Sequence, residues 1–238
     1  MFLFIVELKV KLKLKLKELI KLLKEKSVFN RFLKYATTVT LLILFNTQIQ
    51  AASYDEGIEY LKINPAVSTS VDKGQVEVVE LFWYMCPHCF RFEPNMKKWL
   101  KNKPKNVVFK RVPAIFSPRW RFFAKVYYTT EILGVTEKVH EPLFKALHED
   151  KARLGNEAAM AKFVEKHAGI KQQKFMDIFG SFSVDAKVRK AEDLSKRYKA
   201  QGVPTLVVNG KWRTGGTIAD GHDGMIKVLD HLIKLESK

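Results

Sequence analysis

Cysteine is scarce in this sequence, since its 238 residues contain only Cys86 and Cys89. Two residues separate them, so a disulfide between them would close a very short loop and add little stability. A structural zinc site needs four ligands, and the histidines away from the pair show no spacing that would complete one. We therefore expect no metal and no bound cofactor. We expect these histidines to be exposed or ordinary packing residues: His140, His148, His167, His222 and His231.

Acidic residues are outnumbered in the chain, with 25 Asp and Glu against 42 Lys and Arg, so the formal net charge is +17. Such an excess suits a nucleic acid or an anionic membrane surface as partner. The sequence nevertheless lacks an RNA-binding signature, a zinc-finger spacing and any run of five consecutive basic residues, so we expect no nucleic-acid partner. Hydrophobic residues make up 47% of the chain, which is enough for a packed core.

The sequence also lacks an apolar run long enough to cross a bilayer easily. The apolar stretch over residues 35–45 is eleven residues long. It follows Arg31 and Lys34 and precedes small residues suited to cleavage before Ser53, which is the pattern of a secretory signal peptide. We predict a signal peptide over residues 28–52. The alternative is an uncleaved N-terminal anchor.

Residues 1–27 are rich in Lys and Leu, with eight Lys and three Glu in the first 26 positions. This pattern fits a basic amphipathic segment at a membrane surface. It equally fits upstream sequence from a wrongly assigned start, with the natural start at Val28, and we favour that interpretation. Export would place the two cysteines where disulfides persist. Any membrane contact would then involve a partner protein or the uncleaved N-terminus.

The exported part of the chain mixes strands and helices. Residues 76–84, VEVVELFWY, form a nearly continuous apolar run that is typical of a central buried strand and leads directly to the cysteines. Asn209-Gly210 predicts a tight hairpin between two later strands. The remaining predictions, in chain order, are a helix over 90–101 kinked at Pro94, a strand over 107–116, helices from 117 to about 193, strands over 205–208 and 211–214, and a helix over 226–235.

This order predicts an α/β fold with a mixed central sheet flanked by helices. The stretch after residue 117 holds more helix than one crossover connection needs, so we predict an inserted all-helical domain. The predicted boundaries are residues 53–116 for the first part of the sheet domain, 117–184 for the helical insertion and 185–238 for the second part. We expect a monomer.

The residues between the strand and the first helix are Cys86-Pro87-His88-Cys89, and a C-x-x-C at this position is typical of a dithiol–disulfide centre. Cys86 would lie at the helix N-terminus, where free N–H groups and the helix dipole favour a thiolate. Cys89, one turn inside, would be more buried and would resolve a mixed disulfide. Pro87 stiffens the first turn, and His88 offers a positive charge or a hydrogen bond to Cys86. The disulfide should therefore be a strong oxidant. The alternative for His88 is a solvent-facing turn residue.

Two acidic residues flank the pair of cysteines. Glu80 lies in the apolar strand, where a buried carboxyl would have a raised pKa and would be able to pass protons to Cys89 through water. The alternative is a carboxylate on a solvated edge, because Glu77 lies three positions earlier on the opposite strand face. We expect Glu93, in the following helix, to be a surface or near-site charge with a smaller role.

The stretch Val203-Pro204-Thr205 begins a later strand. Proline at a strand start is consistent with a cis peptide bond and has no N–H to obstruct a nearby thiol. The backbone of Val203 would be free to pair with an extended substrate peptide. The alternative is an ordinary proline at a strand edge.

Taken together, VVELFWYMCPHCFRFEP and GVPTLVVNGKW closely resemble the DsbA family of exported thiol:disulfide oxidoreductases, over essentially residues 54–238. The resemblance implies a thioredoxin fold with an inserted helical domain and a periplasmic location. It implies these roles: Cys86 is the attacked cysteine, Cys89 resolves, His88 stabilises the Cys86 thiolate, Glu80 is the buried acid and Pro204 is cis. It also implies unfolded exported proteins as substrates and reoxidation by a DsbB-type, quinone-linked membrane partner. The Lys/Leu-rich extension and Met85 depart from the family pattern.

Two other functions compete with that of a disulfide donor. A reductase or isomerase would use the same chemistry, but residues 53–75 are too few for the dimerisation domain of a DsbC-type isomerase. A reductase would not need the thiolate stabilisation that His88 offers. A non-catalytic exported binding protein would carry the C-x-x-C as a structural element only.

Overall fold

The computed structural model describes residues 11–26 and 54–237, and the chain divides into two units at residue 53. Residues 11–26 form a helix whose side chains are all exposed. The predicted signal peptide over 28–52 lies outside the described residues. Within the described ranges, no helix combines the length and the apolar character needed to cross a membrane.

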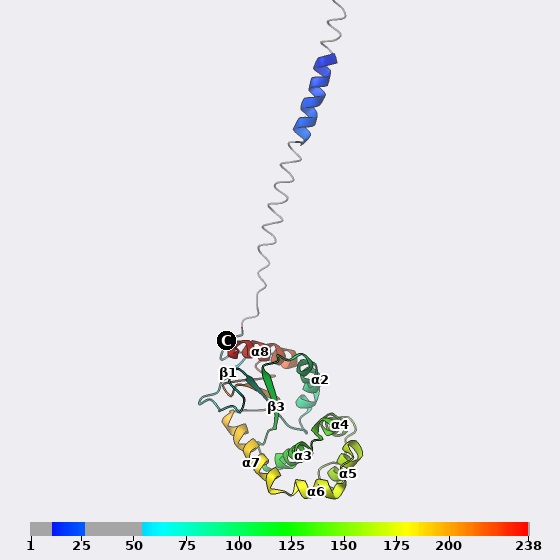
Figure 1. Cartoon of the computed structure of the whole chain (residues 1–238), viewed down its shortest axis with the longest axis vertical. Coiled ribbons are helices and arrows are strands. Elements are labelled where there is room, and N and C mark those ends of the chain that lie inside the picture. The colour runs from blue at the N-terminus through cyan, green and yellow to red at the C-terminus, as the bar shows by residue number, and fades with distance from the viewer. Residues whose placement is uncertain (1–10, 27–53, 238) are drawn as a thin grey trace, which may run out of the picture. The chain divides into compact units, whose positions relative to one another are not determined.

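The larger unit is built on a five-stranded sheet with the strand order β1-β5-β4-β2-β3 (Figure 1). Strand β2 lies next to β3 in parallel and next to β4 in antiparallel orientation. The sheet is therefore mixed, as predicted. The strands are β1 (Leu61–Lys62), β2 (Val76–Phe82), β3 (Val107–Pro113), β4 (Thr205–Val208) and β5 (Trp212–Gly215).

Strand β2 is central because it carries apolar side chains on both faces, and all seven of its residues, Glu77 and Glu80 included, are buried. It ends at Phe82, two residues earlier than predicted. The backbone N–H of Cys86 donates to the carbonyl of Trp83 at 3.0 Å, and this turn ends the extended run. The turn directs the chain from the sheet into the next helix at the two cysteines.

Eight helical segments follow or separate the strands in this unit. Helix α2 begins at Pro87, three residues before the predicted start, and continues through Pro94. The segments are α2 (Pro87–Asn102), the short 3-10 helix η1 (Pro118–Trp120), α3 (Arg121–Ile132), α4 (Thr136–His148), α5 (Glu157–Ala168), α6 (Gln172–Phe179), α7 (Phe182–Arg197) and α8 (Gly221–Glu236).

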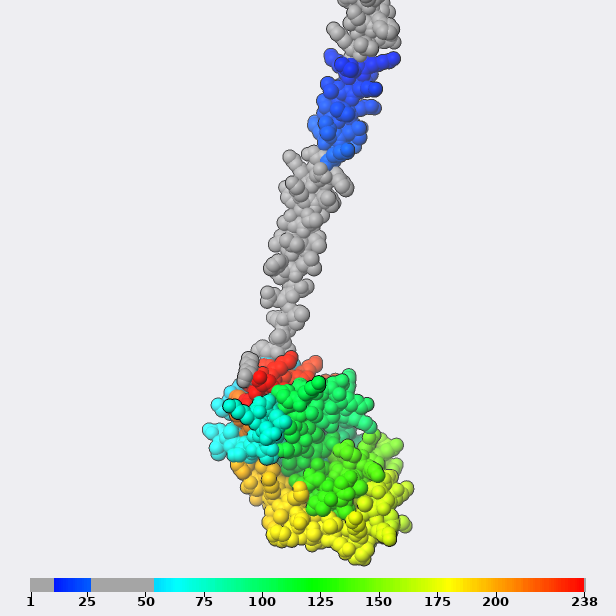
Figure 2. Space-filling model, viewed as in Figure 1, coloured from blue at the N-terminus to red at the C-terminus, as the bar shows by residue number. Residues whose placement is uncertain are grey.

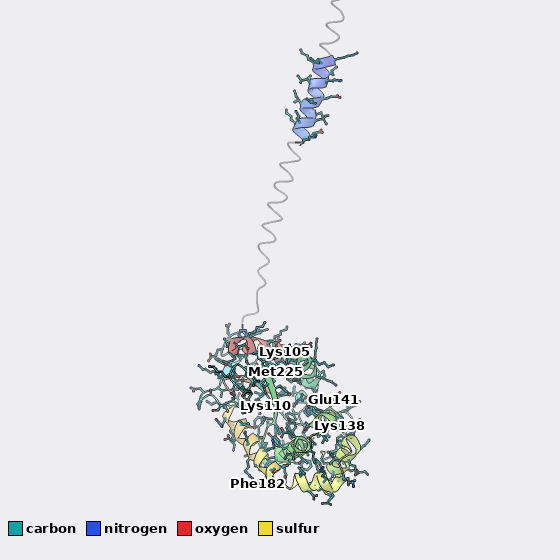
Figure 3. The ribbon with its side chains drawn as sticks, in the orientation of Figure 1. Lys105, Lys110, Lys138, Glu141, Phe182 and Met225 are labelled. Atoms are coloured by element: carbon teal, nitrogen blue, oxygen red, sulfur yellow. The ribbon has the colours of Figure 1, made fainter. Side chains whose placement is uncertain are left out.

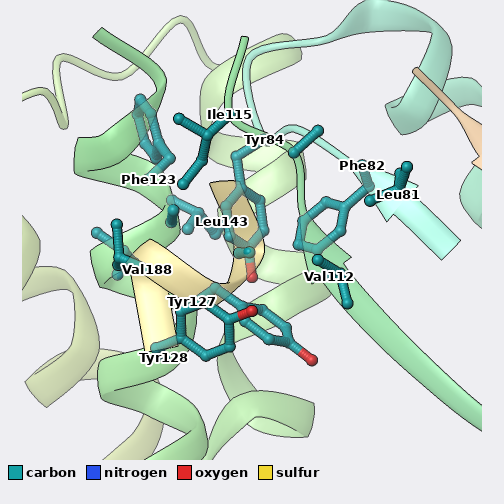
Figure 4. Close-up of a cluster of buried hydrophobic side chains, with 14 of the residues drawn as sticks. Leu81, Phe82, Tyr84, Val112, Ile115, Phe123, Tyr127, Tyr128, Leu143 and Val188 are labelled. Carbon is teal, nitrogen blue, oxygen red and sulfur yellow. The ribbon is translucent and has the colours of Figure 1, made fainter. Parts of the chain in front are cut away.

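Two hydrophobic clusters, one on each face of the sheet, hold the unit together. Residues of β2 contribute to both clusters. Val76 and Val78 pack with α2 and α8 in the first, whereas Val79 and Leu81 pack with α3, α4 and α7 in the second. Figure 4 shows part of the second cluster, in which rings of α3 and a leucine of α4 surround the end of β2. Helices therefore cover both faces, which confirms the predicted architecture.

The helices between β3 and β4 gather at one end of the unit, with α6 and α8 at opposite ends (Figures 1 and 2). The long helix α7 crosses the predicted domain boundary at residue 184. It packs against α3 on one side and returns the chain to β4. The hairpin predicted at Asn209-Gly210 is present, with β4 and β5 antiparallel and Val208 opposite Trp212.

Glycine at position 224, near the start of α8, permits a close approach to the preceding loop. A Cβ atom added there would lie 1.5 Å from the carbonyl oxygen of Ala219. The next residue, Met225, is fully buried and anchors the helix (Figure 3). The loop before α8 is thus held against the helix backbone.

The variant Gly224→Ala should therefore be less stable than the parent, although alanine inside a helix is normally more favourable than glycine by about 0.5–1 kcal/mol. Overpacking against Ala219 should outweigh that gain and lower the free energy of unfolding by about 1–3 kcal/mol. Urea denaturation measures the change. The control is Lys227→Ala, at an exposed position of the same helix, which should change stability by less than about 0.5 kcal/mol. A Gly224→Ala protein as stable as the parent would show that the close approach is absent.

Candidate functional site

Cys86 lies where β2 has ended and α2 begins, and it is the N-cap residue of that helix. Its backbone is extended, with φ −86° and ψ 116°, so its side chain turns back toward the first helical turn. The N–H of Cys89 donates to the Cys86 sulfur at 3.5 Å. The sulfur therefore occupies the position in which a helix N-terminus best accommodates negative charge.

The two thiols differ strongly in acidity. A hydrogen bond from the Cys89 side chain, aided by the N–H groups of Cys89 and His88 and by the charge of His88, lowers the pKa of Cys86 to about 6 although burial opposes it. Burial raises the pKa of Cys89 well above its ordinary value. Near neutral pH this difference favours a Cys86 thiolate beside a protonated Cys89.

His88 is exposed, and Arg91 donates to its Nδ1 atom at 3.1 Å. An arginine can only donate, so Nδ1 accepts in this arrangement and the ring proton lies on Nε2. Arg91, which the sequence analysis did not select, thereby places a guanidinium beside the Cys86 loop.

Val203, Pro204 and Thr205 lie directly against Cys86, although more than a hundred residues separate them in sequence. The Cys86 thiol donates to the carbonyl of Val203 at 3.3 Å. The Val203–Pro204 peptide bond is cis. Thr205 donates through its hydroxyl to the carbonyl of Gly202 at 2.7 Å, which closes the turn before β4. The two stretches selected from the sequence therefore form one site.

Glu80 is completely buried on β2, so the solvated-edge alternative is wrong. Its Oε2 accepts from Nε of Arg111 on β3 at 3.0 Å, while Oε1 has no partner in the described part of the chain. Burial raises the pKa of Glu80 to about 7, although the charge of Arg111 opposes this. The charge of Glu80 in turn raises the pKa of Cys89. Glu80 is thus a carboxyl that titrates near neutrality close to the buried cysteine.

A chain of polar side chains continues from Glu80, and the sequence analysis missed most of it. Arg111 also donates to Glu93 at 3.2 Å, and the Nε2 atom of His140 lies 3.1 Å from the other oxygen of Glu93. The hydroxyl of Tyr84 lies 2.8 Å from Nδ1 of His140. Burial lowers the pKa of His140, and a neutral ring that accepts from Tyr84 and donates to Glu93 satisfies both bonds.

The prediction that Glu93 is a lesser near-site charge is therefore wrong in part, because it joins Arg111 to His140. The prediction for the histidines is also wrong for His140, which is buried and hydrogen-bonded at both ring nitrogens. His148 bonds the backbone carbonyl of Tyr84 at 2.8 Å and stacks on Phe90. Helix α4 thus supplies two histidines to the segment before Cys86. Their spacing of eight places them on one helix face, which is the signal that could have found them.

Apolar side chains also lie near Cys86, on the segment that precedes it and on residues packed against that segment. Trp83 and Trp120 stack with ring centroids 4.0 Å apart, and Phe116 packs on Trp120 at 4.9 Å. Phe116 and Met85 are each 40% exposed. The surface beside Cys86 is thus partly apolar, which suits contact with an extended polypeptide. No group of three or more His, Cys, Asp or Glu within the described ranges is arranged to hold a metal.

Comparison with known proteins gives consistent matches. Residues 111–232 match the model of the DSBA-like thioredoxin domain family. The chain is 38% identical over 200 residues to the thiol:disulfide interchange protein DsbA of Azotobacter vinelandii, which covers 83% of this chain and 92% of the relative. It is similar to the crystal structure of DsbA from Pseudomonas aeruginosa, with a TM-score of 0.72, 38% identity, and 77% and 94% of the two chains covered. The DsbA structure from Xylella fastidiosa matches with a TM-score of 0.72 at 28% identity.

The acidity of Cys86 predicts a pH dependence in the reduced protein. Alkylation by iodoacetamide should accelerate as the pH rises through about 6, since only the thiolate reacts. Folding lowers the pKa of Cys86 from its ordinary value of 9.0 to about 6. The thiolate therefore stabilises the reduced fold fully at a pH above 9.0, and this stabilisation is lost as the pH falls to about 6. The control Cys86→Ser should show no titration in this range. A midpoint near 9 would contradict the geometry.

The buried charges predict a second effect, at Arg111. The variant Arg111→Met leaves Glu80 and Glu93 without their shared cation, which should cost about 3–5 kcal/mol of unfolding free energy at pH 7. Adding Glu80→Leu to Arg111→Met should recover part of the loss. The control Lys97→Met removes a cation whose pair with Glu141 is exposed, and it should leave the urea midpoint nearly unchanged. Equal midpoints for Arg111→Met and the parent would exclude a structural role for this pair.

Proposed function

The chain belongs to the DsbA family of thiol:disulfide oxidoreductases, and we propose that it donates its Cys86–Cys89 disulfide to newly exported proteins. The observation that carries this proposal is the difference in acidity between the two thiols. A thiolate that the fold stabilises favours the reduced form of the pair. The disulfide is correspondingly easy to reduce and therefore oxidises its client.

The proposed reaction has two exchanges. A client thiolate attacks the Cys86 sulfur, the Cys86–Cys89 bond breaks, and Cys89 leaves with the electron pair and takes up a proton. A second client thiolate then attacks the client sulfur of the mixed disulfide and expels Cys86 as a thiolate. The client loses two electrons and gains a disulfide, and the enzyme gains those electrons as a dithiol. Cys86 is the better second leaving group because its pKa is the lower one.

Glu80 is suited to deliver the proton that Cys89 takes up. Its pKa of about 7 keeps it partly protonated at neutral pH, and its Oε1 atom has no partner in the described part of the chain. The chain through Arg111, Glu93 and His140 holds it in place. Glu80 would thus act as a general acid in the first exchange and as a base when the pair is reoxidised.

The Val203 backbone supports a way of binding the client. Its carbonyl oxygen lies 3.3 Å from the Cys86 sulfur and accepts from it when Cys86 is protonated. An extended client chain lying beside Val203 and Pro204 would bring its own sulfur to the same place by main-chain pairing. Unfolded exported proteins fit this mode, because they offer extended segments with free backbone groups.

The remaining parts of the proposal follow from family membership. We expect the exported protein to act in the periplasm as a monomer. A DsbB-type, quinone-linked membrane oxidase would accept the two electrons of the dithiol and regenerate the disulfide.

The reduction potential of the Cys86–Cys89 pair tests the proposal. Equilibration of the purified protein in glutathione buffers should give a potential more oxidising than that of the glutathione pool. The oxidised protein should also speed disulfide formation in a reduced client protein, and Cys86→Ser should abolish that activity.

The alternatives predict different results. A potential near that of thioredoxin would indicate a reductase. A pair that exchanges with no thiol would indicate a structural disulfide in a binding protein.

A further inference from the structure

The groove beside Pro204 has a composition that the proposed chemistry does not require. It has a volume of about 500 Å³, and Val203, Pro204 and His88 place it next to the Cys86 site. Its other walls are the strand and loop from Arg213 to Ile218 and the first residues of α8. Among the described residues that line it, three are basic or imidazole side chains and none is acidic.

Arg213 is the most informative of these residues. It lies on β5 and is partly buried, and its Nε atom is buried without a hydrogen-bond partner in the described part of the chain. Burial is the cause that lowers its pKa, and no carboxylate opposes it. A buried donor without an acceptor is unfavourable by roughly 1–3 kcal/mol, more when it is charged. Arg213 lines the groove, and no carboxylate among the described residues neutralises its charge.

Other basic side chains gather at the mouth of the groove. Burial lowers the pKa of His222, and the positive charges of Arg91 and His88 lower it further. Those effects place His222 of α8 near both residues of α2. Asp223 opposes them, but its carboxylate accepts from Asn95 at 2.6 Å and does not line the groove. The guanidinium of Arg91 therefore lies close enough to this end of the groove to act on His222.

We propose that this groove selects client segments that carry an acidic side chain close to the reacting cysteine. This inference rests on the proposed function, because it concerns the polypeptide that reacts with Cys86. A guanidinium binds a carboxylate through two parallel hydrogen bonds, which a glutamine or a lysine of the client does not reproduce. The imidazoles of His88 and His222 offer ring N–H groups that can donate to the same carboxylate.

The probe is a set of three dithiol peptides that differ at one position, two residues before the first cysteine, where they carry Glu, Gln or Lys. Stopped-flow mixing with the oxidised protein measures the second-order rate constant for each peptide. At low salt the Glu peptide should react about fivefold faster than the Gln peptide, and the Lys peptide should react slowest. Salt at about 1 M, where the Debye length is about 3 Å, should shrink the differences.

Variants locate the effect in the groove. Arg213→Gln should reduce the ratio of the Glu to the Lys rate constant toward one, and Arg213→Lys should restore only part of it. His222→Gln should reduce the ratio by a smaller factor and provides an independent test, should Arg213→Gln fold poorly. The control Lys174→Gln removes one positive charge at an exposed position of α6, away from the groove, and should leave the ratio unchanged.

The outcomes separate this inference from the proposed function. If none of the three peptides is oxidised, the proposed function fails. If all three are oxidised at equal rates, or if Arg213→Gln and His222→Gln both keep the full ratio, the donor function stands and acidic selection by the groove is overturned.

Discussion

The stabilisation of one sulfur atom at the start of a helix is the interaction on which the chemistry of this protein depends. Cys86 caps α2, and the groups that would otherwise be unsatisfied at the helix N-terminus face its sulfur. The helix must begin at Pro87 for this to happen, and β2 must end before it. The turn at Trp83 sets both limits. The placement of Cys89 one turn deeper then follows from the helix itself.

The acid–base partners of the site lie in the protein interior, where burying a charge is energetically unfavourable. Glu80 lies on the central strand, where water has no access, so its charge must be matched from within the protein. Arg111 supplies that match from the neighbouring strand, where it is the direct register partner of Glu80. Glu93 and His140 extend the chain to the helical region. Strand β2, which carries Glu80, and helix α4 are thereby joined by ion pairs and hydrogen bonds as well as by apolar packing.

The client side of the site combines two kinds of surface. Near Trp83 and Trp120 it is aromatic and apolar, which suits many unfolded sequences. Along Arg213 and His222 it is cationic, which favours some sequences over others. Residues 53–238 contain 32 Lys and Arg against 22 Asp and Glu, a net charge of +10, so their general charge and this local groove attract the same kind of polypeptide.

The sequence alone determined the class of this protein. An apolar strand run, a C-x-x-C at the following helix start and a distant Val-Pro strand are local patterns, and each has a direct physical meaning. They sufficed for the α/β fold, for the family and for the burial of Glu80. Only the tertiary structure decided the partners of those groups. Arg111, His140 and Arg213 are ordinary residues in their own segments, and their importance arises because folding brings them beside residues distant in sequence. Because burial and opposing charge are properties of the packed molecule, no spacing along the chain reveals them.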